Sequence, residues 1–318
     1  MTWRMSAPFP LVILGEFLAV AAFYPATRWT GTKRRVAFGL LMAVIFLAPL
    51  AIPADRRISR LAATLVAAWM AAKLLDVYVN AGRREPLSLG SYLVSIPDYA
   101  LGRERCDVPA ARTAAIVRRD ALRLLRRCAA LVAALGACVL VFKVHWSRYP
   151  LALEHAVKAP LVMTMMICFA QAVAGLWWLA GGRGLDFMGP FPLFAATPSE
   201  FWRRWNQPAY AFFELYCARR LGGMRHPVRA IRVTFLVSGL GHEYVFSVPA
   251  GRLQGYQTAF FLIHGLAVIA TLRARPKGWW RLPWWLVTFA FLLVTTVPFG
   301  LSVNEILPIY DHRSTGSA

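Results

Sequence analysis

Two histidines lie deep inside apolar stretches of the sequence, where a neutral imidazole can accept a proton. His242 occurs within a predicted helix over 229–249, and His264 within the next predicted helix over 255–272. His242 lies roughly 10 Å before the end of its helix, and His264 lies roughly 12 Å after the start of the next one, at a rise of about 1.5 Å per residue. Because the two helices are consecutive and antiparallel, the two histidines are expected at one depth. Burial favours the neutral imidazole, which is the form that acts as a general base. The alternative is a pair of hydrogen-bonded packing residues.

A second segment combines a strong helix start with aromatic, basic and amide side chains. Thr197 is a capping residue, and Glu200 follows three positions later. The predicted helix places Trp202 and Asn206 four residues apart on one face, and Pro208 should then break or kink it. By composition alone, the alternative is an amphipathic helix in the membrane interface, with tryptophans at the level of the lipid headgroups.

The other ionisable side chains within apolar stretches are few. Glu16 lies in the first stretch, and Lys73 and Asp76 lie three residues apart on one face of the third. Ionisable residues are costly inside membrane spans and therefore mark candidate functional groups. For Lys73 and Asp76 the favoured interpretation is an ion pair that closes a helix contact. Glu16 either faces a cavity or bonds to a neighbouring helix.

Eight apolar stretches approach the roughly 20 residues that a membrane-spanning helix needs. They cover 8–26, 36–53, 61–80, 128–145, 159–180, 229–249, 255–272 and 282–303. The chain is 58% hydrophobic and 16% charged, against about 45–50% and 25% in soluble domains. This composition excludes a disordered or coiled-coil protein. It predicts an all-α polytopic membrane protein, a single membrane domain over 1–318 with about eight transmembrane helices and one interfacial cytoplasmic helix.

Lysine and arginine gather in every second connection between the apolar stretches. Of 36 basic residues, 24 fall in 27–35, 81–127, 181–228 and 273–281. The positive-inside rule places these connections in the cytoplasm and both termini on the other side. The net charge of +21 is divided among separate loops without a DNA- or RNA-binding motif, which argues against a nucleic-acid partner. We expect a multi-pass protein of the inner or plasma membrane, surrounded by membrane lipids.

The sequence carries no signature of a metal or cofactor site. Its five cysteines form no CxxC pair, and no Cys/His spacing typical of zinc occurs. No Walker loop or dinucleotide fingerprint is present either. We therefore expect neither a metal ion nor a bound cofactor.

The two segments with candidate chemistry together resemble a known signature. Phe201-Trp202-x-x-Trp205-Asn206-x-Pro208 is followed about 35 residues later by His242-Glu243-Tyr244-x-x-Ser247-x-Pro249. The pair is similar to the membrane-bound O-acyltransferase (MBOAT) superfamily, in the branch of wax synthases, diacylglycerol acyltransferases and sterol acyltransferases, and the resemblance is clear over 186–272. The chain lacks a glycine that some wax synthases carry between the Trp and the Arg pair. The sub-branch, and with it the acceptor, stays open.

The resemblance implies transfer of an acyl group from acyl-CoA, as donor substrate, to the hydroxyl of a hydrophobic alcohol. Such a transfer needs a base for the hydroxyl proton and a donor to the tetrahedral oxyanion. His242 would activate the hydroxyl for direct attack on the thioester, and Asn206 would orient the thioester or donate to the oxyanion. His264 would bind the acceptor hydroxyl. Further substrate contacts are expected from Trp202, Trp205, Arg203 and Arg204.

Five arginines near this segment would attract the phosphates of coenzyme A on the cytoplasmic side. They are Arg203, Arg204, Arg219, Arg220 and Arg225. Equally weighted is the alternative that they serve only the positive-inside rule and anionic headgroups. Two other functions stay open: acetylation of a small metabolite or glycan, and transport along a polar path through His242 and His264. The sequence does not fix the acyl length or the oligomeric state, and a homo-oligomer is compatible with it.

Overall fold

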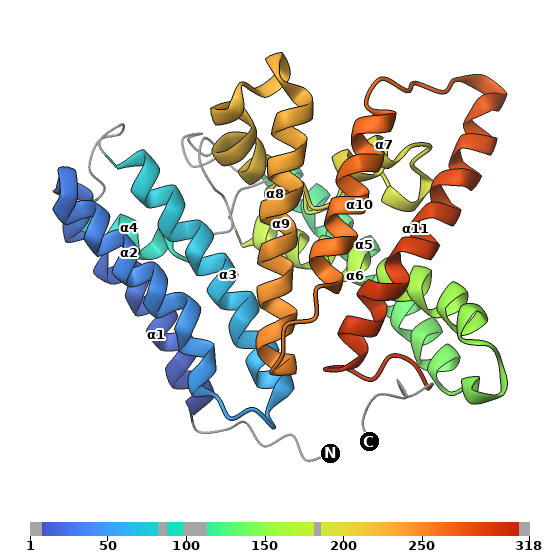
Figure 1. Ribbon diagram of the computed structural model, residues 1–318, viewed down its shortest axis with the longest axis horizontal. Coiled ribbons are helices and arrows are strands. Elements are labelled where there is room, and N and C mark those ends of the chain that lie inside the picture. The colour runs from blue at the N-terminus through green and yellow to red at the C-terminus, as the bar shows by residue number, and fades with distance from the viewer. Residues whose placement is uncertain (1–7, 82–87, 98–112, 181–185, 312–318) are drawn as a thin grey trace. The chain divides into compact units, whose positions relative to one another are not determined.

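The computed structural model describes residues 8–81, 88–97, 113–180 and 186–311 (Figure 1). Regular structure in these residues is helical, and none of them forms a β-strand. The chain divides into two compact units. The first unit comprises Met1–Gly102, Leu240–Gly255 and Glu305–Leu307, and the second comprises Arg103–Gly239, Tyr256–Asn304 and Pro308–Ala318. Helix α9 (Pro227–Ala250) contributes residues to both.

The first unit is a bundle of apolar helices that run side by side in Figure 1. Its helices are α1 (Pro8–Ala22), α2 (Gly31–Leu47), α3 (Arg57–Asn80), α4 (Leu89–Ser95) and the last part of α9. The buried core includes Val20, Phe23, Ile45, Met70 and Leu74. Two hydrogen bonds tie α9 to this bundle. The Tyr244 hydroxyl donates to the Phe46 carbonyl at 2.9 Å, and the Thr64 hydroxyl lies 3.1 Å from the Val245 carbonyl.

The second unit contains a long antiparallel hairpin of two helices together with shorter elements (Figure 1). Its helices are α5 (Ala114–Phe142), α6 (Leu151–Leu179), α7 (Pro198–Arg204), α8 (Gln207–Phe213), the first part of α9, α10 (Tyr256–Thr271) and α11 (Arg281–Asn304). Glycines allow α9 and α10 to approach closely. A Cβ added at Gly239 would lie 3.1 Å from Phe261 Cβ, and one at Gly265 would lie 2.9 Å from Phe235 Cβ. Small residues serve this purpose at many membrane helix interfaces.

Six helical segments among the described residues are long and apolar enough to cross a membrane, as a polytopic membrane protein requires. They are Pro8–Arg28, Gly31–Ala51, Arg57–Asn80, Ala114–Phe142, Leu151–Leu179 and Gly278–Asn304. The expected total of eight is not confirmed. Helix α10 has only 16 residues, and α9, although it has 24 residues, includes two arginines, His242 and Glu243 and is not among the six. The single membrane domain over 1–318 stays a prediction.

The predicted span over 128–145 belongs to a helix that begins earlier. Helix α5 starts at Ala114, where the Thr113 hydroxyl accepts a hydrogen bond from the Ile116 N–H at 3.3 Å. Its first turns are rich in arginine, which is a good helix former, so the helix continues well beyond its apolar part. The hydropathy pattern marks only the apolar portion of such a helix.

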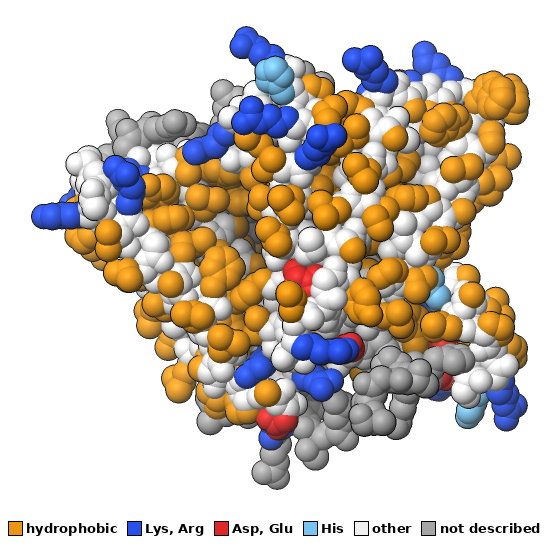
Figure 2. Space-filling view, in the orientation of Figure 1, with side chains coloured by type: hydrophobic (Ala, Val, Ile, Leu, Met, Phe, Trp, Pro, Cys, Tyr) orange, Lys and Arg blue, Asp and Glu red, His pale blue; other side chains and the backbone are white. Residues whose placement is uncertain are grey.

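Apolar side chains are exposed along the outside of these helices. Leu11, Leu14 and Leu18 of α1 and Val132 and Leu140 of α5 are each more than half exposed. Figure 2 shows hydrophobic side chains continuing along the helices on the visible face, whereas lysines and arginines gather near helix ends. Large exposed apolar surfaces of this kind mark interaction or membrane surfaces, and the basic helix ends suit lipid headgroups.

Candidate functional site

Helix α7 begins where the sequence predicts, and several contacts fix its start. The Thr197 hydroxyl accepts from the Glu200 N–H at 3.0 Å, and the Glu200 carboxylate accepts from the Ala196 N–H at 2.7 Å. This arrangement is similar to a capping box. Burial raises the pKa of Glu200, but the Ala196 N–H and the guanidinium groups of Arg204 and Arg281 outweigh it and hold that pKa below its ordinary value. The ionised carboxylate therefore anchors the helix.

Asn206 lies after the end of α7 and not on its face. The helix stops at Arg204, Trp205 is extended, and Asn206 precedes α8 in the left-handed region, with φ 41° and ψ 70°. The prediction that Trp202 and Asn206 share one helix face is therefore wrong. Pro208 explains the break, because in a continuous helix its ring clashes with the carbonyl four residues earlier and it has no N–H to donate.

The backbone of Asn206 is unusual in the part of the chain that the structure describes. It is the one residue there, apart from glycines, with a positive φ. Asparagine tolerates this conformation better than most residues, yet the conformation still costs free energy. Backbone outliers of this kind cluster at functional sites, so the observed outlier makes Asn206 a functional candidate independently of any motif.

The side chain of Asn206 is only partly used by the fold. Its Oδ1 accepts from the Ala209 N–H at 3.2 Å and so caps α8. Its Nδ2 donates to no acceptor among the residues described. The amide therefore keeps hydrogen-bond donors available to a ligand while its oxygen holds the side chain in place.

The loop before α7 holds Asn206 from the other side. The Asn206 N–H points at Met188 Sδ at 3.3 Å, and the next N–H, of Gln207, donates to the Phe187 carbonyl at 2.8 Å. Gln171 of α6 in turn donates to the Met188 carbonyl at 2.8 Å. This hydrogen bond joins α6 to the loop. A long helix and a loop together position the strained asparagine.

Asn206 also lies on the wall of an apolar cavity of about 470 Å³. The cavity is lined by Met165, Met166, Phe169 and Ala170 of α6, by Phe187 and Met188, and by Trp205 and Asn206. Methionine side chains are flexible and polarizable, so they adapt to irregular apolar ligands. The arrangement suits an alkyl chain lying next to an amide donor.

Trp202 and His264 meet in a different place, where His264 is fully buried and Trp202 is partly buried. Trp202 Nε1 donates to His264 Nδ1 at 3.1 Å, so that nitrogen is an acceptor. His264 Nε2 then carries the hydrogen and donates to the Thr295 hydroxyl at 2.8 Å. Thr295 passes its own hydrogen to the Phe291 carbonyl at 2.7 Å. Both nitrogens of the buried ring have protein partners, and binding of an acceptor hydroxyl by His264 stays a prediction.

His242 belongs to the first unit, on the last part of α9, and its side chain is half-buried. Its neighbour Glu243 has a structural role. Glu243 Oε1 accepts from the Ser247 hydroxyl at 2.8 Å and from the N–H groups of Gln254 and Gly255 at 3.0 and 2.6 Å. These bonds fix the turn between α9 and α10. Glu243 lies about 100° around the helix from His242, so the two adjacent polar residues face different surroundings.

The two arginines of the motif differ from each other. Arg204 pairs with Glu200 and donates to the Phe191 carbonyl at 3.3 Å, so it is committed to the fold. Arg203 is exposed and has no acidic partner among the described residues. Of this pair, Arg203 is the one that can meet a charged substrate.

The residues that sequence reasoning missed lie far from the motifs along the chain. Met165 and Met166 belong to a methionine-rich run over 163–166, a signal of adaptable apolar surface that was available in the sequence. Met188 and Thr295 carry no comparable local signal. Only tertiary packing brings Met188 to Asn206 and Thr295 to His264.

Comparison with known proteins gives partial similarities. No protein-family model matches the chain. It is 32% identical over 118 residues to "Probable long-chain-alcohol O-fatty-acyltransferase 2" of Arabidopsis thaliana, and 29% identical over 145 residues to "Probable long-chain-alcohol O-fatty-acyltransferase 3" of that plant. The matches cover 33% and 39% of this chain and 34% and 41% of those relatives. The chain therefore spans only about a third to two fifths of the relatives that it matches, and the similarity agrees with the resemblance carried by the motifs.

Proposed function

We propose that the protein is a membrane O-acyltransferase that moves a fatty acyl group from acyl-CoA to the hydroxyl of a long-chain alcohol, producing a wax ester. The names of the similar plant proteins support this substrate class. The structural observation that carries the proposal is Asn206, which is held in a left-handed conformation on the wall of an apolar cavity and keeps amide donors unused by the fold.

The cavity and Asn206 suit the acyl donor. An acyl chain would lie against the methionines and aromatic rings, with its thioester carbonyl near the amide. Asn206 Nδ2 would donate to the carbonyl oxygen, which gains negative charge when the carbonyl carbon is attacked. A positioned donor of this kind contributes about 10²–10³-fold to the rate of acyl transfer.

His242 is assigned the role of general base toward the alcohol. It takes the hydroxyl proton as the alcohol oxygen forms its bond to the thioester carbon. The tetrahedral intermediate then collapses, the carbon–sulfur bond breaks, and the proton passes from His242 to the departing thiolate of coenzyme A. The products are the ester and free coenzyme A, and no acyl-enzyme forms. A positioned base contributes about 10²–10⁴-fold.

His264 and Trp202 are assigned a positioning role in place of the acceptor binding expected from the sequence, because both ring nitrogens of His264 already have protein partners. Their hydrogen bond joins α7 to α10, and the bond from His264 to Thr295 extends it to α11. Because α7 leads directly into Asn206, this buried chain fixes the direction from which the asparagine approaches its ligand. Exposed Arg203 supplies positive charge for the phosphates of the donor.

The test is to incubate membranes containing the protein with labelled acyl-CoAs of several chain lengths and a panel of alcohols, and to identify the ester formed. We expect esters of long-chain acyl groups and long-chain alcohols from the wild type. The His242→Ala variant should form at least about 10²-fold less ester. The matched control is His145→Ala, at an exposed histidine between α5 and α6, which should keep full activity.

The same panel of acyl-CoAs and alcohols distinguishes the proposed function from the two alternatives, acetylation of a small molecule and transport. Ester formed from acetyl-CoA and a small hydroxylated acceptor, without long-chain products, would replace the proposed substrates by a metabolite or glycan. Movement of a solute across the membrane with no ester in any combination would contradict acyl transfer. Near-full ester formation by His242→Ala, with the variant inserted at normal levels, would contradict the role assigned to this histidine.

A further inference from the structure

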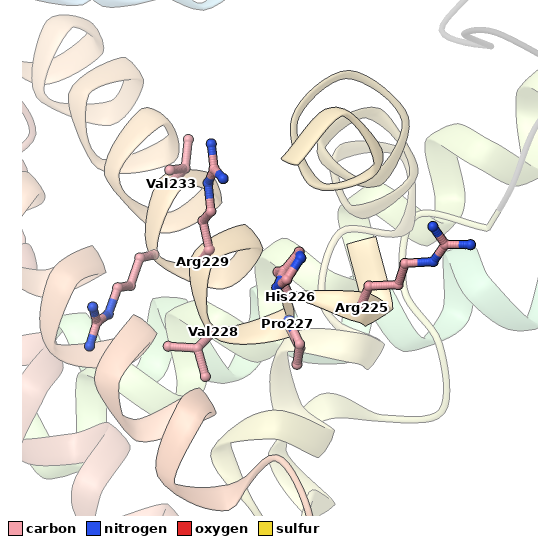
Figure 3. A pocket seen from close by; sticks show the side chains of 7 residues that line it. Arg225, His226, Pro227, Val228, Arg229 and Val233 are labelled. Atoms are coloured by element: carbon pink, nitrogen blue, oxygen red, sulfur yellow. The ribbon is translucent and has the colours of Figure 1, made fainter. Parts of the chain in front are cut away.

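A second pocket, of about 520 Å³, lies at the beginning of α9 and shares no lining residue with the Asn206 cavity. Basic side chains form much of its lining (Figure 3). They are Arg225, His226, Arg229 and Arg232. The turn before α9 places the histidine, because Gly222 has a φ of 97° and a Cβ added there would lie 2.7 Å from His226 Cδ2. A side chain at position 222 would therefore displace the ring.

The three arginines of this pocket lack acidic partners among the described residues. Arg204 shows the contrast, since it pairs with Glu200 in the same unit. Arg225, Arg229 and Arg232 are all exposed. Figure 3 shows Arg225 and Arg229 extending on different sides of His226, so they form a rim around the pocket. Like charges around one pocket repel each other, and a bound anion relieves that repulsion.

The rest of the pocket is apolar. Val228 and Val233 line it beside the basic rim. The apolar surface continues along α9, where Leu236 and Val237 are 41% and 42% exposed. Figure 2 agrees, because blue side chains gather around the start of α9 and orange side chains follow along it. A ligand that fills this surface has an anionic part at the rim and an apolar part along the helix.

Two further features favour a phosphate as the anionic part. The pocket lies at the N-terminal end of a helix of 24 residues, where free N–H groups and the helix dipole attract anions. Arginine also binds phosphate through two parallel hydrogen bonds. A free nucleotide would use the basic rim but leave the exposed valines and leucine of α9 uncovered. A phospholipid would use both.

We propose that this pocket binds an anionic phospholipid, with its phosphate at the arginine rim and an acyl chain along the apolar face of α9. The connection before α9 is predicted to be cytoplasmic, and the cytoplasmic leaflet is the one rich in anionic lipids. The site shares no residue with the acyl-transfer chemistry proposed above, which uses Arg203 for the phosphates of the donor, and its existence does not depend on that chemistry. Arg225, which the sequence led us to expect near coenzyme A, is assigned to the lipid instead.

The experiment uses the purified full-length protein in a neutral detergent. Dioleoyl phosphatidic acid and dioleoyl phosphatidylcholine are titrated separately, and bound lipid is counted by native mass spectrometry. Phosphatidic acid should bind more tightly. The double variant Arg229→Gln/Arg232→Gln should weaken its binding about tenfold, the loss of one or two charge-assisted hydrogen bonds. The matched control Arg118→Gln/Arg126→Gln removes the same charge from exposed positions of α5 and should leave binding unchanged.

A second variant and a second ligand complete the test. Val228→Asp puts a negative charge on an exposed wall of the pocket, and it should also weaken phosphatidic acid binding without lowering the melting temperature. If Arg229→Gln/Arg232→Gln and Arg118→Gln/Arg126→Gln weakened phosphatidic acid binding equally, the proposed site would be overturned, because the total charge alone would then explain binding. Pyrophosphate that binds as tightly as phosphatidic acid, with the same loss in Arg229→Gln/Arg232→Gln, would overturn the lipid assignment and indicate a soluble phosphate compound.

Discussion

The Asn206 cavity and the buried chain from Trp202 through His264 to Thr295 are two polar regions of the same unit that differ in what the fold leaves unused. In the buried chain every ring nitrogen has a partner, and the last hydroxyl passes its hydrogen to a carbonyl. Asn206 instead adopts a strained backbone conformation, borders a cavity and keeps donors for a ligand. A satisfied network rigidifies a fold, whereas a strained residue with unused donors is equipped for chemistry.

Asn206→Asp is the substitution that should separate the two regions most strongly. Aspartate keeps an oxygen that can cap α8 and tolerates the left-handed conformation, but it has no amide hydrogens. We expect ester formation to fall about 10²–10³-fold, with the melting temperature within a few degrees of the wild type. Labelled-ester assays and thermal unfolding in detergent measure the two effects. A large loss of melting temperature with proportionate loss of activity would assign Asn206 to the fold.

Substitutions in the hydrogen-bond chain from Trp202 through His264 to Thr295 should instead lower stability more than activity. His264→Ala removes two hydrogen bonds and leaves Trp202 Nε1 without its acceptor, so we expect a loss of about 3 kcal/mol in the free energy of unfolding. Thr295→Val removes only the hydroxyl and should cost about 1–2 kcal/mol. In both variants the activity per folded molecule should fall less than in Asn206→Asp. Activity that is abolished in Thr295→Val at normal stability would instead support a direct catalytic role for this chain.

The cavity itself is tested by filling it. Met165→Trp adds volume to the wall formed by α6 and should shift the preferred acyl-CoA toward shorter chains, because less apolar space remains. Each methylene excluded from an apolar pocket is worth about 1 kcal/mol. The control is Leu176→Trp on the exposed surface of the same helix, which should leave the preference unchanged. A chain-length profile identical in wild type and Met165→Trp would show that the acyl chain lies elsewhere.

The smallest predicted effect concerns the start of α7. The pKa of Glu200 is lowered in the folded protein, so its ionised form contributes stability above its unfolded pKa, near about 4.3. That contribution is lost as the pH falls through the lowered folded value. Melting temperatures measured from pH 7 to pH 3 should therefore fall less steeply for Glu200→Gln than for the wild type. Glu214→Gln, which removes an exposed ion pair with Arg219, should change the profile less.

Local sequence signals predicted the elements that depend on local chemistry. The start of α7 follows from the capping hydroxyl of Thr197 and the returning carboxylate of Glu200. The helical character of all eight apolar stretches followed from their composition, and the break near Asn206 from Pro208. These features need only neighbouring residues, so the sequence contains enough information to place them.

Features that depend on distant contacts were not predictable in this way. The left-handed angles of Asn206 require the loop around Met188, which Gln171 of α6 holds. The partners of His264 come from α7 and α11. Periodicity within one helix cannot specify which residue of another helix will meet it, so the cavity wall and the buried hydrogen-bond chain emerge only from the fold.

The two helices that carry the candidate histidines are also the two that fall short as membrane spans. Helix α9 contains His242 and Glu243 among its apolar residues, and α10 has only 16 residues. In α9 hydropathy and function conflict, because polar groups such as His242 reduce the apolar character of a helix. Helix α10 is apolar and falls short only in length.

The most direct test of the central claim is a comparison of ester formation by His242→Ala, Asn206→Asp and the double variant, each normalised to inserted protein. If both residues act on one transition state, each single variant should lose about 10²-fold or more, and the double variant should lose less than the product of the two. A near-wild-type rate in either single variant, with His145→Ala and wild type equal, would contradict the proposed mechanism.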